Sequence, residues 1–144
     1  MTTVQPSSHS ILIVEDEEAH AELARRVIRK AGFGSRIDVA CDGEEALNYL
    51  GRVGDFEDEN RPPMPGLILL DIKLPGVGGL EVLERIKAHP ALNKIPVVML
   101  TTSDRKEDVT ESYRLKANCY LTKPLGVKEF EETMEQVGLH GFHQ

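Results

Sequence analysis

The sequence is poor in cysteine and aromatic residues, and it has no long apolar run. Its 144 residues include two cysteines, three tyrosines, four phenylalanines and no tryptophan. Two cysteines without Cys-x-x-Cys spacing are too few for a disulfide framework or a zinc motif. No apolar run approaches the ~20 residues that span a bilayer, and the amino terminus, MTTVQPSSHS, lacks the basic start and apolar core of a secretory signal. These absences predict a cytoplasmic protein without a membrane segment.

Positive charge is also scarce. The chain carries 17 Lys and Arg against 24 Asp and Glu, a net charge of −7. This balance argues against general affinity for nucleic acid phosphates or an anionic membrane surface, but it leaves room for a cation site. The length and a hydrophobic fraction of 40% suit one globular domain with its own core.

Short apolar runs alternate with segments of helical periodicity. The runs at 11–14, 67–70 and 95–100 are too short for helices and suit strands buried on both faces. Segment 36–41 alternates as an edge strand does, and 119–122 is a fifth, short strand. Because a helical pattern follows each strand, we expect five βα units with parallel strands and right-handed crossovers, which is a doubly wound α/β domain.

The expected domain covers residues 10–138, between a disordered tail at 1–9 and a short tail at 139–144. Segment 51–66 holds four acids, three prolines and three glycines, and it predicts a loop longer than usual. The helix that follows residue 102 has a thin apolar face, which makes it a candidate for mobility. Since nothing follows residue 144, we expect no output domain in the chain.

Polar side chains stand where the predicted strands end. The first strand is followed by Glu15 and Asp16, the third by Asp71, and the fifth by Lys123, while Thr101 closes the fourth. Each acid alone could equally cap a helix or be solvated. In a parallel sheet, however, all of these ends meet at the edge where such folds bind ligands, and their agreement favours a functional site.

The chemistry of this set indicates phosphoryl transfer. Clustered carboxylates repel one another unless a cation joins them, and oxygen ligands without Cys or His favour Mg²⁺ over Zn²⁺. A metal ion on Asp16 and Asp71, with Lys123 and the Thr101 hydroxyl, would neutralise phosphoryl oxygens from several sides. Asp71 lies on a central strand, so its carboxylate is the expected nucleophile and would form an aspartyl phosphate.

Four motifs resemble the signatures of a response-regulator receiver domain, in order and over about residues 10–138. They are ILIVED (11–16), LILLDIKLPGVGG (67–79), VVMLTT (97–102) and YLTKP (120–124). The resemblance implies a flavodoxin-like doubly wound (βα)5 fold with a five-stranded parallel sheet in the order 2-1-3-4-5. That order would place Cys41 and Cys119 at opposite edges, too far apart for a disulfide.

The resemblance also implies a role for each strand-end residue. Asp71 would be the phosphoacceptor beside the acidic pair Glu15 and Asp16. Mg²⁺ would be held by Asp16, Asp71 and the main-chain carbonyl of Lys73, with Glu15 acting through water.

The remaining implied roles concern switching. Thr101 would move toward the phosphoryl group, Lys123 would ion-pair with it, and Tyr120 would be an aromatic switch that turns inward. The bond between Lys123 and Pro124 matches a cis peptide in the family.

The implied protein is a single-domain response regulator of a two-component phosphorelay. It would take a phosphoryl group from a sensor histidine kinase or a phosphotransfer protein and signal by contact with a downstream protein, without being a classical enzyme. The kinase would dock near the helix after Asp16, and the output face would include Tyr113 and Tyr120. Output faces of such domains can form homodimers. The long 51–66 loop resembles that of regulators paired with phytochrome-type sensor kinases.

Three rival readings are weaker. A haloacid-dehalogenase-type phosphatase also uses a strand-end Asp and Mg²⁺, but it needs a second Asp two residues later, where this chain has Lys73. A flavodoxin-like cofactor module would need a phosphate-binding glycine motif, and none occurs. A receiver-like scaffold that is never phosphorylated would lack an essential group, and none is missing.

Many relatives carry Asn at the position of Lys73, so the phosphoryl lifetime is expected to differ.

Overall fold

The computed structural model describes residues 7–34, 36–53, 55 and 57–139. Its elements follow in strict alternation, with bounds β1 (Ser7–Val14), α1 (Glu18–Lys30), β2 (Arg36–Ala40), α2 (Gly43–Val53), β3 (Pro65–Leu70), α3 (Gly79–Ala88), β4 (Val97–Thr101), α4 (Lys106–Arg114), β5 (Cys119–Thr122) and α5 (Val127–Gln136). The five predicted βα units are therefore confirmed. Strand β1 begins three residues before the expected domain boundary, and residues 1–6 and 140–144 of the expected tails lie outside the described residues.

The sheet is parallel throughout, in the order β2-β1-β3-β4-β5, as the resemblance implied. Its register aligns the carboxyl ends of the strands, because Val14 pairs with Leu70 and Leu70 pairs with Met99. Strand β2 is an edge strand, as its alternating pattern predicted. Cys41 directly follows the edge strand β2, and Cys119 begins β5 at the opposite edge. Both are free thiols.

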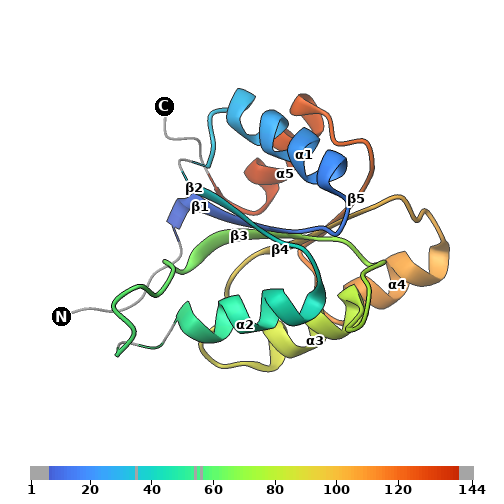
Figure 1. The fold of residues 1–144 in the computed structure, drawn as a ribbon. Helices are drawn as coiled ribbons and strands as arrows, with labels where there is room; N and C mark the ends of the chain where they lie inside the picture. Colours follow the sequence, from blue (N-terminus) through green and yellow to red (C-terminus); the bar gives the residue numbers. More distant parts are fainter. Residues whose placement is uncertain (1–6, 35, 54, 56, 140–144) are drawn as a thin grey trace.

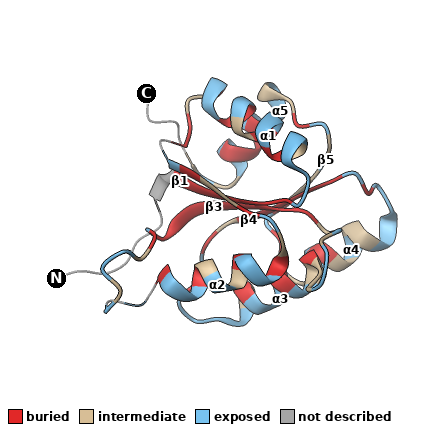
Figure 2. Ribbon diagram, viewed as in Figure 1, coloured by how far each residue is buried: buried red, intermediate tan, exposed pale blue. Residues whose placement is uncertain are grey.

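Helices cover both faces of the sheet (Figure 1). Helices α1 and α5 pack on one face, while α2, α3 and α4 pack on the other. Each face has its own apolar core, and the alternating side chains of β1 and β3 contribute to both, so Leu67 and Leu69 face one core while Ile68 and Leu70 face the other. The central strands are accordingly buried on both faces (Figure 2), which explains their uninterrupted apolar runs.

One connection, between α2 and β3, differs from the sequence-based expectation. Helix α2 continues through Gly51 to Val53, and β3 begins at Pro65, so the expected 51–66 loop is shorter. Arg52 stabilises its turn, since its guanidinium donates to Asp58 Oδ2 at 2.8 Å and to the Asn60 carbonyl at 3.0 Å. No helix in the described part of the chain has the length and apolar character needed to cross a bilayer.

Candidate functional site

Backbone hydrogen bonds hold the residues that follow the strands at one edge of the sheet. The amide of Asp71 donates to the Val14 carbonyl at 3.2 Å, and the amide of Glu15 donates to the Ala40 carbonyl at 2.9 Å. The amide of Lys123 donates to the carbonyl of Thr101 at 2.8 Å. The sheet ladder thus extends one residue past the strand ends and fixes where these side chains leave the core.

Three carboxylates converge at this edge. Oxygen atoms of Glu15, Asp16 and Asp71 lie within 4.8 Å of one another. Glu15 and Asp71 are buried whereas Asp16 is exposed, so solvent reaches the cluster from one side. Carboxylates this close repel unless a cation neutralises them, and an all-oxygen donor set suits a hard divalent ion. The cluster therefore fits a metal site.

The ammonium of Lys123 bridges two of these carboxylates. Its Nζ donates to Glu15 Oε1 and, at 2.9 Å, to Asp71 Oδ2. Burial by itself would lower the pKa of Lys123, but hydrogen bonds to the two carboxylates and their negative charge outweigh burial and raise this pKa above its ordinary value. Lys123 thus stays charged, and its bond to Pro124 is cis, as the resemblance implied.

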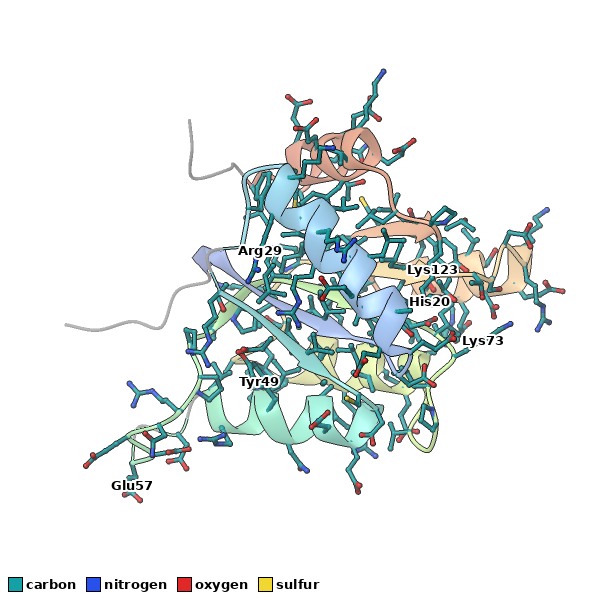
Figure 3. The ribbon with its side chains drawn as sticks, turned by 45° about the horizontal axis from the view of Figure 1, so that its top comes forward. His20, Arg29, Tyr49, Glu57, Lys73 and Lys123 are labelled. Atoms are coloured by element: carbon teal, nitrogen blue, oxygen red, sulfur yellow. The ribbon has the colours of Figure 1, made fainter. Side chains whose placement is uncertain are left out.

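A tight turn surrounds Asp71. The Asp71 Oδ1 atom accepts a hydrogen bond from the Lys73 amide at 3.2 Å. The Lys73 side chain is exposed near the same edge (Figure 3). Farther along, the Gly79 amide donates to the Ile72 carbonyl at 2.9 Å. A Cβ at Gly79 would lie 1.9 Å from the Asp71 carbonyl oxygen, so only glycine fits there. Steric contact with the backbone of Asp71 therefore explains why the last residue of the turn is glycine.

Thr101 and Tyr120 both contact Ser103, a buried residue that was not among the predicted site residues. The Thr101 hydroxyl oxygen accepts from the Ser103 amide at 3.3 Å, and the Tyr120 hydroxyl donates to the Ser103 carbonyl at 2.8 Å. The Ser103 hydroxyl itself donates to Asp108 Oδ2 at 2.5 Å. The two predicted switch residues are therefore joined through one residue of the β4–α4 loop.

His20 was not among the site residues predicted from the sequence. His20 lies in the first turn of α1, and its Nδ1 is 2.9 Å from Lys123 Nζ and 3.3 Å from Glu17 Oε2. Its position in the first turn of the helix that follows Glu15 and Asp16 was the signal that could have found it.

Comparison with known proteins agrees with this geometry. The family profile described as response regulator receiver domain matches residues 11–135. The response regulator Rcp1 of Synechocystis sp. is 40% identical over 127 residues, which cover 88% of this chain and 84% of that protein. Two similar solved structures are each 40% identical to this chain. The bacteriophytochrome response regulator AtBRR matches with a TM-score of 0.79, over 94% of this chain and 96% of that one. The Mn²⁺-bound form of Rcp1 matches with a TM-score of 0.72, over 90% of this chain and 91% of that one. The chain belongs to the response regulator receiver domain family and is a regulator, not a classical enzyme.

Proposed function

We propose that this response regulator accepts a phosphoryl group on Asp71 and later loses it by hydrolysis. The observation that carries the proposal is the Lys123 ammonium, which is held against Glu15 and Asp71 inside a cluster of three carboxylates. A carboxylate oxygen of Asp71 attacks the phosphorus atom, and the bond from phosphorus to the donor breaks in line. Lys123 is placed to neutralise the transferred oxygens, since one of its N–H groups already points at Asp71.

Mg²⁺ is the cofactor that the donor set favours. Asp16, Asp71 and the main-chain carbonyl of Lys73 would hold it, with Glu15 acting through water, and it would supply charge neutralisation for the phosphoryl oxygens. The Mn²⁺-bound form of the related Rcp1 supports the binding of a divalent ion. The hydrogen bond from the Lys73 amide to the Asp71 carboxylate keeps the backbone of Lys73 beside the cluster.

The phosphoryl donor we propose is a sensor histidine kinase of the phytochrome type, or a phosphotransfer protein. Two relatives of known structure, AtBRR and RtBRR, are named as bacteriophytochrome response regulators, and these names support this class of partner. The donor would dock near α1, which carries His20 beside the site. A cytoplasmic location agrees with two free thiols.

The output we propose is contact with another protein, or with a second copy of the chain, through α4, β5 and α5. Thr101 would move toward the phosphoryl group and Tyr120 would follow, because both contact Ser103. Tyr113 on α4 is 49% exposed and would mark this face. An added phosphoryl anion beside Lys123 is the charge change that biases the loop.

The deciding experiment is labelling by acetyl phosphate with Mg²⁺, or by a phosphorylated sensor kinase. Wild-type protein should gain one acid-stable, base-labile phosphoryl group, and Asp71→Asn should gain none. Asp55→Asn, which alters an exposed acid of the α2–β3 loop, is the matched control and should label normally. Equal labelling of wild type and Asp71→Asn would refute the assignment of Asp71.

A further inference from the structure

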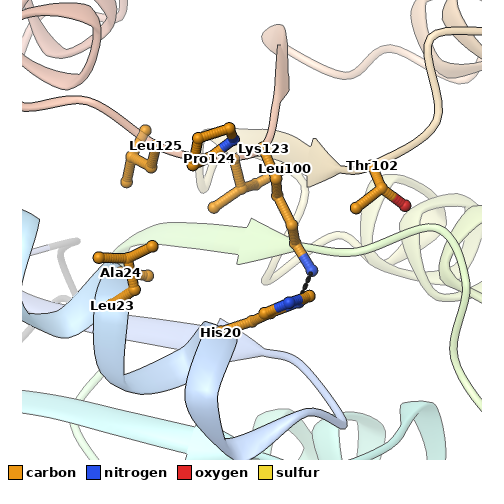
Figure 4. A pocket seen from close by; sticks show the side chains of 8 residues that line it. All are labelled: His20, Leu23, Ala24, Leu100, Thr102, Lys123, Pro124 and Leu125. Carbon is orange, nitrogen blue, oxygen red and sulfur yellow. Dashed lines mark hydrogen bonds between the residues drawn. The ribbon is translucent and has the colours of Figure 1, made fainter.

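We propose that His20 is a positioning residue for Lys123. The Nδ1 lone pair of His20 accepts a hydrogen bond from the third N–H of the Lys123 ammonium and so keeps the ammonium directed toward Asp71 during phosphoryl transfer. This inference rests on the proposed function, because it concerns the reaction at Asp71. Its starting point is the contact of 2.9 Å between His20 Nδ1 and Lys123 Nζ (Figure 4).

The three protons of the Lys123 ammonium match three acceptors. Two are the carboxylate oxygens of Glu15 and Asp71, and the third is Nδ1 of His20. These acceptors come from the end of β1, the end of β3 and the first turn of α1. The ammonium is therefore tied to three separate elements that meet at the site.

The contact fixes the tautomer of His20. An ammonium group has no lone pair, so Nδ1 must be the acceptor and the ring proton of the neutral imidazole lies on Nε2. Glu17 Oε2 is 3.3 Å from the same Nδ1 and would accept a hydrogen bond from Nδ1–H in the opposite tautomer. The two contacts exclude each other, and the shorter contact to Lys123 selects the Nε2–H tautomer.

A metal ion is the competing explanation for this histidine. Donor atoms of Glu15, Glu17 and His20 lie within 4.8 Å of one another and form a set that could bind one. The Lys123 ammonium already lies against Nδ1, however, and a metal at that point would face its positive charge. The contact is therefore better assigned to Lys123.

The surroundings supply few substitutes for Nδ1. A cavity of about 230 Å³ opens beside Lys123 between α1 and the β5–α5 connection. Apart from His20, Lys123 and Thr102 its lining is apolar, namely Leu23, Ala24, Leu100, Pro124 and Leu125 (Figure 4). Without His20 the third N–H would face these side chains or disordered water, and the flexible lysine stem would lose a restraint.

The restraint matters at the moment of transfer. The N–H directed at Asp71 Oδ2 is the one that meets the incoming phosphoryl oxygens. With the other two N–H groups held by Glu15 and His20, that direction is set before the donor arrives. Such preorganisation lowers the barrier because little reorientation remains in the transition state.

The tautomer is the first test, because its first measurement uses the wild-type protein and needs no variant that could misfold. ¹⁵N chemical shifts of the His20 ring in wild-type protein should show the Nε2–H form with Nδ1 as an acceptor. In Lys123→Ala the ring should turn to the Nδ1–H form, which donates to Glu17. A wild-type ring in the Nδ1–H form, or one unaffected by the loss of Lys123, would overturn the proposal.

Labelling kinetics are the second test. With acetyl phosphate and Mg²⁺, His20→Leu should lower the maximal rate by about tenfold while the half-saturating donor concentration stays the same, since a hydrogen bond to a charged group is lost. His20→Asn should stay within about twofold of wild type, because its Oδ1 takes the place of Nδ1. Leu23→Ala, which lines the same cavity without contacting the ammonium, is the control.

The outcomes separate the two proposals. If wild type labels on Asp71 and His20→Leu labels as fast, the positioning role fails while the proposed function stands. If His20→Asn loses as much rate as His20→Leu, the acceptor role fails. If wild-type protein does not label at all, the proposed function fails first.

Discussion

Among single residues, Gly79 meets the strictest steric requirement near Asp71. A Cβ there would lie 1.9 Å from the Asp71 carbonyl oxygen and 2.7 Å from Ile72 Cα, both of them backbone atoms. We expect Gly79→Ala to destabilise the fold by roughly 2 kcal/mol or more, and to slow labelling of Asp71 because the turn must shift. Urea unfolding and acetyl phosphate labelling measure the two effects.

The neighbouring Gly78 is the matched control for that substitution. Its Cβ would meet only the Ile72 carbonyl oxygen, at an ordinary contact distance of 3.9 Å. Gly78→Ala should therefore keep nearly wild-type stability and labelling. Equal losses in both variants would mean that loop flexibility, and not crowding against Asp71, explains the glycines.

Tyr49 gives a pH-dependent test at the same scale. Its hydroxyl donates to Asp38 Oδ2 at 2.7 Å, and burial, followed by this hydrogen bond and the charge of Asp38, raises the pKa of Tyr49 well above its ordinary value. In the unfolded chain the phenol ionises near pH ~10, whereas the folded protein keeps the proton to higher pH. The stabilisation by Tyr49 is therefore complete below the pH of about 10 at which the unfolded chain ionises, and it declines above that pH.

Comparison with Tyr49→Phe isolates this contribution. Below pH ~9 wild type should be more stable than Tyr49→Phe by about 1 kcal/mol, the usual net value of one hydrogen bond. The advantage should shrink by pH ~11, since the unfolded wild-type chain alone gains stability by ionising. Urea unfolding at both pH values measures the difference, and a constant difference would contradict the assignment.

At the scale of elements, α4 buries fewer residues than the other helices. Ser112 is its one buried residue, whereas α3 buries Gly79, Val82, Leu83 and Ile86. We expect amide hydrogens of α4 to exchange faster than those of α3 in the unphosphorylated protein, because opening α4 exposes little apolar surface. Mass-spectrometric hydrogen exchange tests this, and equal protection of the two helices would remove the basis for α4 as the mobile part of the output face.

The start of α4 also shows where sequence patterns fall short. Asp104 and Glu107 have the spacing of a capping box, but Arg105 is the N-cap and its side chain makes no capping hydrogen bond. The hydroxyl of Ser103 instead accepts from the Arg105 amide and donates to Asp108. Local spacing could not reveal this because Ser103, which follows β4, is held by Tyr120 on the neighbouring strand β5.

At the scale of the whole molecule, the strand-end rule explains why so much of the site was predictable. Glu15 and Asp71 follow buried strands and Lys123 follows the edge strand β5, and a parallel sheet brings such strand-end positions together whatever the loops do. His20 was not predictable in this way. Its contact with Lys123 joins residues 103 positions apart and depends on how α1 is rotated on the sheet, which periodicity does not fix to the precision of a hydrogen bond.

The same convergence of charge predicts how the whole fold responds to Mg²⁺. Three carboxylates lie around the Lys123 ammonium at one edge, in a chain of net charge −7, so a bound divalent ion should relieve repulsion in the folded state and not in the unfolded chain. At a concentration about 100 times its dissociation constant, Mg²⁺ should add ~2.7 kcal/mol to the free energy of unfolding.

Two variants separate site binding of Mg²⁺ from general charge screening. Asp16→Asn should lose most of the gain from Mg²⁺, and without Mg²⁺ it should be no less stable than wild type, since it removes one of the repelling charges. Asp55→Asn removes the same charge from an exposed loop and should keep the full gain. Thermal unfolding with Mg²⁺ or EDTA at fixed ionic strength measures both. If Asp55→Asn lost the gain as completely as Asp16→Asn, the stabilisation would come from net charge and not from the strand-end carboxylates.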